Sequence, residues 1–342
     1  MQDGINHDAL HAYLSQHIPD FEGELTINAF AAGQSNPTYL LETPTKKYVL
    51  RRKPSGKLLP SAHAVDREYR VMTALGKTGF PVPKTYLYAE EPEIVETPFF
   101  VMDFVEGRVF FNTRMPELEP DERRQMFEAI NRTMAQLHAI DPESVGLGDY
   151  GKQGNYFTRQ IGRWSKQYKA SETDDIPEMD NLIAWLPDNI PVDDTETRVI
   201  HGDFGLHNLM FHPTEPRIVA VLDWELSTLG HPIADLTYNM MPWYAPHVEN
   251  VMVSFQGLDL EAHGVPAFEE YMTRYCERTG RDPIEKPDFF KAYNLFRLAA
   301  IAQGIVARAI QGNASNPQAM QLRQFVRPLA ELGWQFAKSA GA

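Results

Sequence analysis

The octet His201-Gly202-Asp203-Phe204-Gly205-Leu206-His207-Asn208 places an aspartate two residues after a histidine and an asparagine five residues after that aspartate. The segment 208–211, which begins with the last residue of the octet, reads as a strand, and a second apolar run at 218–222 ends at another acid, Asp223. Two such strands form a hairpin. We therefore expect Asn208 and Asp223 to lie near one another at the open end of that hairpin.

The spacing of the octet is that of a kinase catalytic loop, in which the aspartate accepts the proton of an attacking hydroxyl and the asparagine holds Mg²⁺. Phosphoryl transfer depends on positioning and on cations against the phosphate oxygens. Mg²⁺ prefers hard oxygen ligands and keeps several waters, so one carboxylate and one amide suffice beside a nucleotide. A lone His-x-Asp also occurs by chance, but Asp223 in the correct order favours the functional interpretation.

Composition sets the broad class of the protein. The 342 residues contain 43% hydrophobic and 23% charged residues, which is typical of a soluble globular chain of one large domain or two lobes. A net charge of −14 without a basic stripe argues against a nucleic-acid partner. With one cysteine, Cys276, no internal disulfide forms. No signal peptide and no apolar run of membrane-spanning length is visible, so we expect a cytoplasmic protein without a membrane partner.

The N-terminal part is predicted to be rich in strands. We expect strands at 25–30, 38–43, 47–52, 85–88 and 99–102, with one helix at 64–75 inserted between them and a short helix at 7–17 before them. After Gly107 helices dominate. They are predicted at 121–139, 156–170, 178–187, 231–241, 246–254, 266–278, 287–311 and 317–338, and the acidic segment 171–195 is read as a surface insertion.

The sequence resembles the aminoglycoside phosphotransferase and choline kinase-like family over about residues 25–330. The motifs Leu222-Asp223-Trp224-Glu225 and His231-Pro232-Ile233-Ala234-Asp235-Leu236 carry the likeness. The segments 48–54 and 59–69 are most like the kinase-like domains associated with acyl-CoA dehydrogenases. The resemblance implies an α+β, protein-kinase-like bilobal fold. Its N-terminal nucleotide-binding lobe would span residues 1–105, with a small antiparallel sheet and one helix, and its larger helical lobe residues 106–342.

The resemblance also implies roles for single residues. Asp203 would be the catalytic base, and Asn208 and Asp223 would bind Mg²⁺, with Glu225 as a further metal ligand or a solvated strand end. His201 would pack the loop. Asp235 would accept backbone N–H bonds from the catalytic loop and so be architectural.

The nucleotide roles fall in the N-terminal part. Kinases pair a lysine on the third strand with a glutamate on the next helix. Here Arg51 takes the lysine position and Glu68 the glutamate position. A guanidinium still clamps phosphate, through two forked donors. Arg52 and Lys53 are nearby competitors, and strand alternation turns Arg51 and Arg52 to opposite faces.

Two backbone segments complete the expected nucleotide site. Ser35 and its neighbours lie where kinases fold a glycine-rich lid, although only one glycine is present, and an ordinary hairpin turn is the alternative. The segment 102–107 resembles a kinase hinge, in which adenine would bond the carbonyl of Asp103 and the N–H of Val105. ATP is the expected nucleotide, and GTP stays an alternative.

On the acceptor side we expect a small molecule with a hydroxyl group. The relationship to acyl-CoA dehydrogenases suggests a hydroxylated acyl compound, and an aminoglycoside or choline-like acceptor, which the acidic charge of the chain would allow, is the alternative. Candidate substrate residues are Trp243, Tyr244 and Arg297, for which core packing is the competing interpretation. The alternative functions are a nucleotide-binding pseudokinase-like module of weak or no activity and a metal-dependent hydrolase. The histidines lack the helical His-x-x-x-His spacing that would favour the hydrolase. The oligomeric state is left open.

Overall fold

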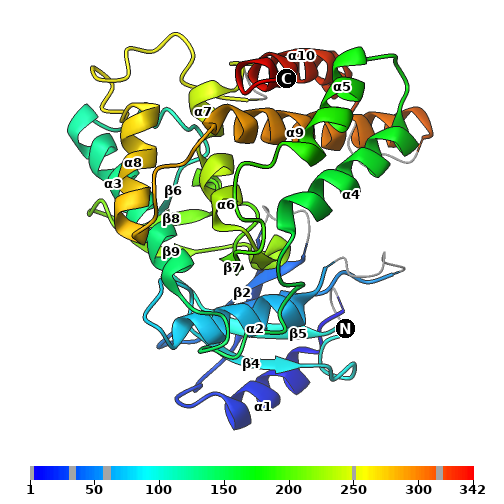
Figure 1. The fold of residues 1–342 in the computed structure, drawn as a ribbon. Coiled ribbons are helices and arrows are strands. Elements are labelled where there is room, and N and C mark those ends of the chain that lie inside the picture. Colours follow the sequence, from blue (N-terminus) through cyan, green and yellow to red (C-terminus); the bar gives the residue numbers. More distant parts are fainter. Residues whose placement is uncertain (1–3, 31–35, 57–62, 249–251, 313–318) are drawn as a thin grey trace. The chain divides into compact units, whose positions relative to one another are not determined.

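The computed structural model describes residues 4–30, 36–56, 63–248, 252–312 and 319–342 (Figure 1). The chain divides into two compact units. Unit 1 comprises residues 1–109, 142–150 and 207–227, and unit 2 comprises 110–141, 151–206 and 228–342. Asn208 and Asp223 therefore group with the N-terminal residues. These units are defined by contacts within the chain, whereas the predicted lobes are defined by function. The division into lobes at residue 105 therefore stays a prediction.

Unit 1 is built on an antiparallel five-stranded sheet in the order β1-β2-β3-β5-β4. Its strands are β1 (Thr26–Ala29), β2 (Thr38–Glu42), β3 (Lys47–Arg52), β4 (Thr85–Ala89) and β5 (Phe99–Asp103). Every strand expected in this part forms, within two residues at each end. The central strands β3 and β5 are the most buried, and their registers pair Leu50 with Val101 and Arg51 with Phe100.

One helix packs on each face of this sheet. Helix α1 (His7–His17) buries Leu10 and Leu14, which are four residues apart and lie in one core cluster with Leu41 and Leu50. Helix α2 (Val65–Gly76) contacts β4 and β5 on the other face, where Tyr69 lies against Phe100. The alternation of side chains along the strands thus supplies two apolar faces from one sheet.

A second small sheet in unit 1 has the order β6-β8-β9, formed by β6 (Arg108–Val109), β8 (Leu209–Phe211) and β9 (Ile218–Val221). The hairpin predicted from residues 208–223 is therefore present. Gly107 is needed at its edge, because an added Cβ would meet the carbonyl oxygen of Phe211 at 2.4 Å.

Unit 2 is mainly helical. Its longest helix, α9 (Pro287–Ile310), runs beside α4 (Tyr156–Ser171) and α10 (Arg323–Ser339) in Figure 1. The other elements are α3 (Pro120–Ala139), α5 (Pro177–Trp185), α6 (Pro232–Asn239), α7 (Met241–Tyr244), α8 (Phe268–Thr279) and the paired strands β7 (Arg198–Ile200) and β10 (Thr228–Gly230). Short 3₁₀ helices lie at 186–188 and 319–322 in unit 2 and at 224–226 in unit 1, and another, at 206–208, includes residues of both units. The α+β class predicted from the sequence is confirmed.

The predicted helix at 246–254 is wrong. The described residues on both sides of 249–251 are not helical, and Val248 pairs with Met252 in an antiparallel bridge. The side chain of Ser254 is buried, and the backbone N–H of Phe255 donates to the carbonyl of Pro242. The carbonyls of Val253 and Ser254 accept hydrogen bonds from the side chains of Thr113 and Arg114, so the described residues of this segment bond to a distant part of the chain instead of forming a helix.

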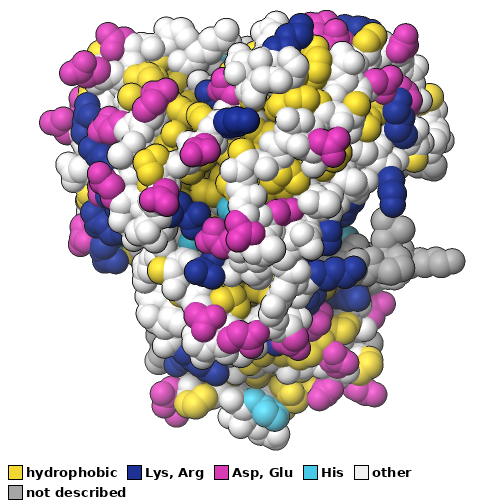
Figure 2. Space-filling model, in the orientation of Figure 1, with side chains coloured by type: hydrophobic (Ala, Val, Ile, Leu, Met, Phe, Trp, Pro, Cys, Tyr) yellow, Lys and Arg dark blue, Asp and Glu magenta, His cyan; other side chains and the backbone are white. Residues whose placement is uncertain are grey.

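The expected surface insertion at 171–195 also has a packed part, because helix α5 within it contacts α10 and buries Met179 and Leu182. None of the described helices is long and apolar enough to cross a membrane. On the face seen in Figure 2, acidic and basic side chains are interspersed. A cytoplasmic location stays a prediction.

Candidate functional site

Arg51 joins two carboxylates within unit 1. It lies on β3, and its Nε atom is 3.0 Å from Oε2 of Glu68 on α2. Its Nη2 atom donates to Oδ1 of Asp223 at 2.6 Å. The planar guanidinium has donors on two edges, so one side chain reaches both acids, which the point charge of a lysine does less well. The predicted pair of Arg51 with Glu68 is present, and the metal-ligand candidate Asp223 is its second partner.

Strand alternation separates Arg51 from its competitor Arg52. The side chain of Arg52 donates hydrogen bonds to the hydroxyls of Ser55 and Thr97 and lies over the ring of Tyr39. These contacts are on the other face of the sheet. Of the two adjacent arginines, Arg51 is therefore the one that contacts the carboxylates.

The buried charges around Arg51 influence one another. Burial raises the pKa of Glu68 to about 7, and the negative charges of Asp223 and Glu225 act in the same direction, while Arg51 lowers it. Burial lowers the pKa of Arg51, but Glu68 and Asp223 outweigh burial and the net shift is upward. The guanidinium therefore stays charged within a group of three acids, and this group would be neutralised further by a cation.

The β8–β9 hairpin brings Asn208 and Asp223 to one end, as the sequence predicts. The backbone N–H of Leu222 donates to the carbonyl of Asn208 at 2.9 Å, so the residue before Asp223 pairs with Asn208. Asp223 itself has φ 62° and ψ 62°, in the left-handed region. This conformation is uncommon outside glycine, although aspartate tolerates it, and such residues cluster at functional sites.

The residues at this end carry the donor types that a hard divalent cation takes. Asp223 and Glu225 supply carboxylate oxygens and Asn208 an amide oxygen, which is the donor chemistry that Mg²⁺ prefers. The side chain of Asp223 is 35% exposed and thus accessible from solvent, whereas Asn208 is 6% exposed. In the described residues no group of three or more His, Cys, Asp or Glu side chains is arranged as a metal site. Asparagine is not among these four residue types, so a site that uses the amide of Asn208 with two carboxylates would not be counted among such groups.

The loop that carries Asp203 is held by Asp235 within unit 2. The backbone N–H groups of His201 and Gly202 donate to the two carboxylate oxygens of Asp235, at 2.6 and 2.9 Å. His138 lies 3.4 Å from the same carboxylate. Burial raises the pKa of Asp235, but His138, His201 and the hydrogen bonds outweigh burial, so the net shift is downward. Asp235 is thus an ionised anchor for the loop, as the resemblance implies.

The side chain of Asp203 has a partner that the sequence analysis missed. The hydroxyl of Tyr238 on α6 donates to Oδ1 of Asp203 at 2.5 Å. Tyr238 follows Asp235 by three residues, which places both on one face of a helix. This spacing was the signal available in the sequence. Helix α6 therefore acts on this loop twice: the carboxylate of Asp235 anchors its backbone, and the hydroxyl of Tyr238 orients the side chain of Asp203.

The chain as a whole is also similar to known proteins. Residues 26–270 match the phosphotransferase enzyme family. The chain belongs to this family. Its similarity to named relatives extends beyond the matched residues at both ends.

Among curated relatives of this phosphotransferase chain is acyl-CoA dehydrogenase family member 11 from Rattus norvegicus, with 43% identity over 335 residues. The match covers 96% of this chain and 43% of the rat protein, so the chain spans less than half the length of that relative. A solved structure from Ralstonia eutropha JMP134, named after the aminoglycoside phosphotransferases, is 46% identical with a TM-score of 0.90 over 98% of both chains.

Choline kinase from Cryptosporidium parvum is similar in fold alone, with 13% identity and a TM-score of 0.62 over 98% of this chain and 96% of the other. These results confirm the kinase-like fold and the resemblance to kinase-like domains of acyl-CoA dehydrogenase relatives. The family and its neighbours support a small-molecule kinase-like activity for this phosphotransferase chain.

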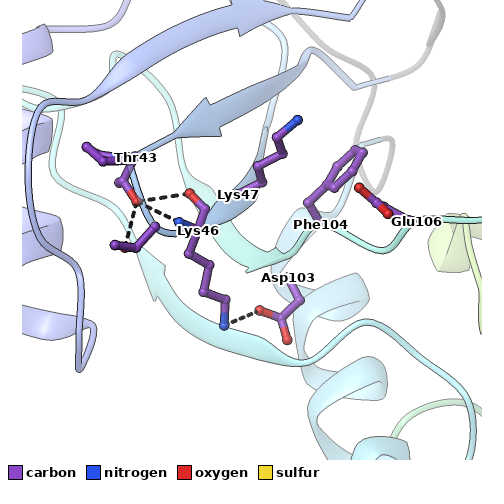
Figure 3. A pocket seen from close by; sticks show the side chains of 8 residues that line it. Thr43, Lys46, Lys47, Asp103, Phe104 and Glu106 are labelled. Atoms are coloured by element: carbon purple, nitrogen blue, oxygen red, sulfur yellow. Dashed lines mark hydrogen bonds and ion pairs between the residues drawn. The ribbon is translucent and has the colours of Figure 1, made fainter.

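The predicted hinge of the phosphotransferase begins where β5 ends. The carboxylate of Asp103 pairs with Lys46 at 2.8 Å and accepts a hydrogen bond from Tyr86 at 2.5 Å. Beside it lies an open pocket of about 480 Å³, lined by residues 43–47, 103–104 and 106 (Figure 3). Val105 follows in the segment 104–107, which has no regular secondary structure. The nucleotide contacts of Asp103 and Val105 stay predictions, and Ser35 lies outside the described residues.

The three substrate candidates lie in unit 2 with different surroundings. The indole N–H of Trp243 donates to the carbonyl of Pro266, and its rings pack against three aromatic side chains, Phe127, Phe255 and Tyr271. The hydroxyl of Tyr244 donates to the carbonyl of Thr237. Arg297 instead donates to the carbonyl of Gly202 in the loop of Asp203. Of the three, Arg297 is the candidate with a direct contact to that loop.

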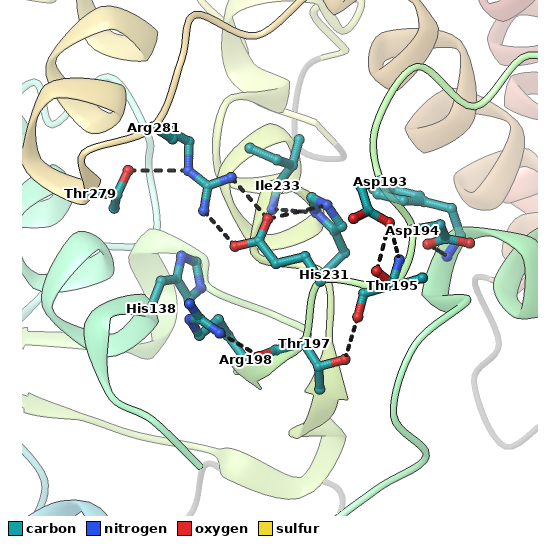
Figure 4. Close-up of polar contacts among 12 residues, drawn as sticks. His138, Asp193, Asp194, Thr195, Thr197, Arg198, His231, Ile233, Thr279 and Arg281 are labelled. Carbon is teal, nitrogen blue, oxygen red and sulfur yellow. Dashed lines mark hydrogen bonds and ion pairs between the residues drawn. The ribbon is translucent and has the colours of Figure 1, made fainter. Parts of the chain in front are cut away.

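A separate polar cluster in unit 2 surrounds Glu196. Arg281 binds the carboxylate of Glu196 through two nitrogens, at 2.9 and 3.2 Å, and His231 lies 3.4 Å from it (Figure 4). Burial lowers the pKa of His231 to about 4, against the opposing effect of Glu196. The imidazole is therefore neutral at pH 7. Its Nδ1 atom accepts from the backbone N–H of Ile233 and caps α6, the helix that carries Asp235 and Tyr238.

Proposed function

We propose that this chain is an ATP- and Mg²⁺-dependent phosphotransferase that moves the γ-phosphate to a hydroxyl group of a small molecule. The observation that carries the proposal is the position of Arg51 between Glu68 and Asp223. It places a permanent cation next to the acid that would share a metal ion with phosphate. In phosphoryl transfer such cations supply most of the catalysis, because they stabilise charge on the phosphate oxygens.

Each residue takes one role in this proposal. Asn208 and Asp223, with Glu225, would hold Mg²⁺, which neutralises charge on the phosphates when bound. Arg51, oriented by Glu68, contacts the phosphates. Ser35 and the backbone of Asp103 and Val105 are the proposed nucleotide contacts at the lid and the hinge.

Asp203 accepts the proton of the acceptor hydroxyl. Tyr238 orients its carboxylate through the 2.5 Å hydrogen bond, and Asp235 anchors the backbone of the loop. A hydroxylated acyl compound is the proposed acceptor class, which the name of the rat relative supports. Because the chain spans 43% of that protein, the activity of the whole relative is not carried over.

A nucleotide-binding module without turnover is the second candidate. The hydrogen bond from Arg51 to Oδ1 of Asp223 favours it, because a metal ion that uses this oxygen has to displace the guanidinium. Both candidate functions include nucleotide binding, and only the first includes transfer of the phosphate to an acceptor.

Nucleotide binding and product formation separate the two candidates. We would measure MgATP binding by calorimetry and search for phosphorylated products by mass spectrometry with a library of hydroxylated metabolites. The kinase proposal expects binding and acceptor-dependent ADP formation, with Asp203→Ala retaining binding and losing product. Binding without any product supports the second candidate, and absence of nucleotide binding contradicts both.

A further inference from the structure

Arg297 carries a charge that no acid pairs with among the described residues. It lies on α9 in unit 2, and its guanidinium carbon is 5.3 Å from the ring centroid of Tyr238 and 5.9 Å from that of Trp164. In the part of the chain that the structure describes, its polar contact is one hydrogen bond, to the carbonyl of Gly202 at 3.3 Å. A guanidinium has five N–H donors, so most of its donor capacity is unused.

Two further donors next to Arg297 are also without an acceptor. The indole N–H of Trp164 and the hydroxyl of Tyr293 are buried and have no hydrogen-bond partner in the described residues. Tyr293 precedes Arg297 by four residues on α9, on the same face of that helix. Buried donors without acceptors are costly. The arrangement is therefore suited to a ligand rich in acceptor oxygens.

Two further arginines act on this cluster, although the chain as a whole carries a net charge of −14. Arg159 and Arg163 lie one turn apart on α4. Both, together with Arg297, lower the pKa of the buried Tyr156 hydroxyl, against the larger effect of burial.

Three acids oppose the positive charge of these arginines. Asp194 accepts hydrogen bonds from the backbone N–H groups of Phe157 and Thr158 at the start of α4. Asp235 is already engaged by the loop N–H groups, and Asp203 is the proposed base, held by a tyrosine hydroxyl. A bound anion gains from the charge of Arg297, because each of the three acids already accepts hydrogen bonds and none of them forms an ion pair with Arg297 in the described residues.

The cluster also lies next to the proposed base. Tyr238 contacts Arg297 with its ring and Asp203 with its hydroxyl, and Gly202, the acceptor of the Arg297 hydrogen bond, immediately precedes Asp203. A molecule whose hydroxyl meets Asp203 would therefore place a neighbouring group near the guanidinium.

We propose that Arg297 binds a carboxylate or similar oxyanion of the acceptor, so that the enzyme selects anionic alcohols over neutral and cationic ones. This inference rests on the proposed function and adds the charge class of the substrate. It disfavours cationic alcohols of the aminoglycoside or choline type as acceptors for this chain.

A matched series of four-carbon alcohols tests the proposal by charge: 4-hydroxybutanoate as the anion, 1,4-butanediol as the neutral probe and 4-aminobutan-1-ol as the cation. Binding of each to the protein with MgADP is measured by ligand-observed NMR, which needs no turnover. ADP formation with MgATP is measured separately. The variants are Arg297→Gln, Arg297→Lys and Arg308→Gln, the last an exposed arginine on the same helix.

The proposal expects the wild type to bind the anion at least tenfold more tightly than the diol, and the cation least. Arg297→Gln should reduce the ratio of anion to diol affinity to near one, Arg297→Lys should keep part of it, and Arg308→Gln should keep all of it. A purely structural role for Arg297 would weaken all three probes alike and leave their ratio unchanged.

Equal affinity for the three probes in the wild type, no measurable binding of the anion, or an unchanged ratio in Arg297→Gln would each overturn the inference. An effect of Arg297→Gln confined to the KM for MgATP would overturn it too, because the anion bound would then belong to the nucleotide. If the anion preference depends on Arg297 but no probe or metabolite is phosphorylated, the binding inference stands and the proposed function fails.

Discussion

Tyr238 donates a hydrogen bond of 2.5 Å to Oδ1 of Asp203, and both residues belong to unit 2. The guanidinium of Arg297 lies over the ring of Tyr238, and the helix of Tyr238 begins with the cap formed by His231. The orientation of the proposed base is therefore set by α6. A change that removes one hydroxyl should disturb catalysis without removing the base.

We expect Tyr238→Phe to lower kcat about tenfold, because one hydrogen bond to a charged group is worth roughly 1.5–3 kcal/mol and part of this orients the carboxylate. The KM for MgATP should change little. Steady-state kinetics measures both constants. Tyr168→Phe is the control, since that buried hydroxyl on α4 has no hydrogen-bond partner among the described residues. Equal kcat for wild type and Tyr238→Phe would show that the hydrogen bond does not position the base.

The charge of Arg51 is expected to matter for folding as well as for binding. Arg51→Met leaves Glu68, which is 2% exposed, without its cation, and breaking such a buried pair costs roughly 3–5 kcal/mol. The double variant Arg51→Met with Glu68→Met should recover most of this loss of stability. Urea unfolding measures it, with Lys47→Met, an exposed position on the same strand, as control.

Nucleotide binding should follow the opposite pattern. The double variant folds but lacks the phosphate-binding cation, so we expect its Kd for MgATP to stay at least tenfold above that of the wild type. Recovery of nucleotide affinity together with stability would mean that Arg51 serves the fold alone.

Asp223 is expected to link metal and nucleotide binding. Asp223→Asn removes the negative charge that Mg²⁺ and Arg51 share, and we expect the Mg²⁺-dependent gain in ATP affinity to fall at least tenfold. Calorimetric titration of ATP with and without Mg²⁺ measures this gain. Asp149→Asn, an exposed acid of unit 1 paired with Arg70, should leave it unchanged. A full Mg²⁺ effect in Asp223→Asn would remove Asp223 from the metal site.

The buried His231 predicts a pH dependence of stability. Its pKa in the folded protein is about 4, lower than the ordinary value of 6.5, because burial disfavours the charged imidazole. Between these two values the unfolded chain binds the proton and the folded chain does not, so acidification favours unfolding. The contribution of His231 is fully present above pH 6.5 and is lost as the pH falls toward 4. It amounts to at most about 3 kcal/mol.

His231→Asn retains a cap for α6, because asparagine is a favourable residue at this position, but it cannot titrate. We expect the free energy of unfolding of this variant to fall less steeply than that of the wild type between about pH 6.5 and 4.5. Urea unfolding at a series of pH values gives both slopes, and parallel slopes would contradict the role of His231.

Local patterns predicted much of this fold because they and the tertiary contacts agree. Strand alternation distinguished Arg51 from Arg52, and the apolar runs around 209 and 221 located the hairpin of Asn208 and Asp223. The helix predicted at 246–254 is wrong because hydrogen bonds from distant residues, Thr113 to Val253 and Arg114 to Ser254, decide the conformation of the described part of this segment. Tyr238 was missed because a tyrosine on a buried helix face looks like core packing until the carboxylate beside it is known.

The sequence also did not predict that Arg51 contacts two acids. Glu68 was expected from the spacing of kinases, but the contact with Asp223 joins residues 172 positions apart. Likewise, that Arg297 has no acidic partner in the described structure depends on what several different elements place around it. Sequence patterns thus predicted the elements and their polar residues, and the packing of those elements decided the partners.

The central claim is tested most directly by ³¹P NMR of the protein with MgATP and hydroxylated acceptors, comparing wild type with Asp203→Asn. We expect the wild type to form ADP and a phosphomonoester only with an acceptor present, and Asp203→Asn to do so roughly 10²–10⁴-fold more slowly while retaining nucleotide affinity. Product formation at equal rates by the two proteins, or none by a wild type that binds MgATP, would contradict it.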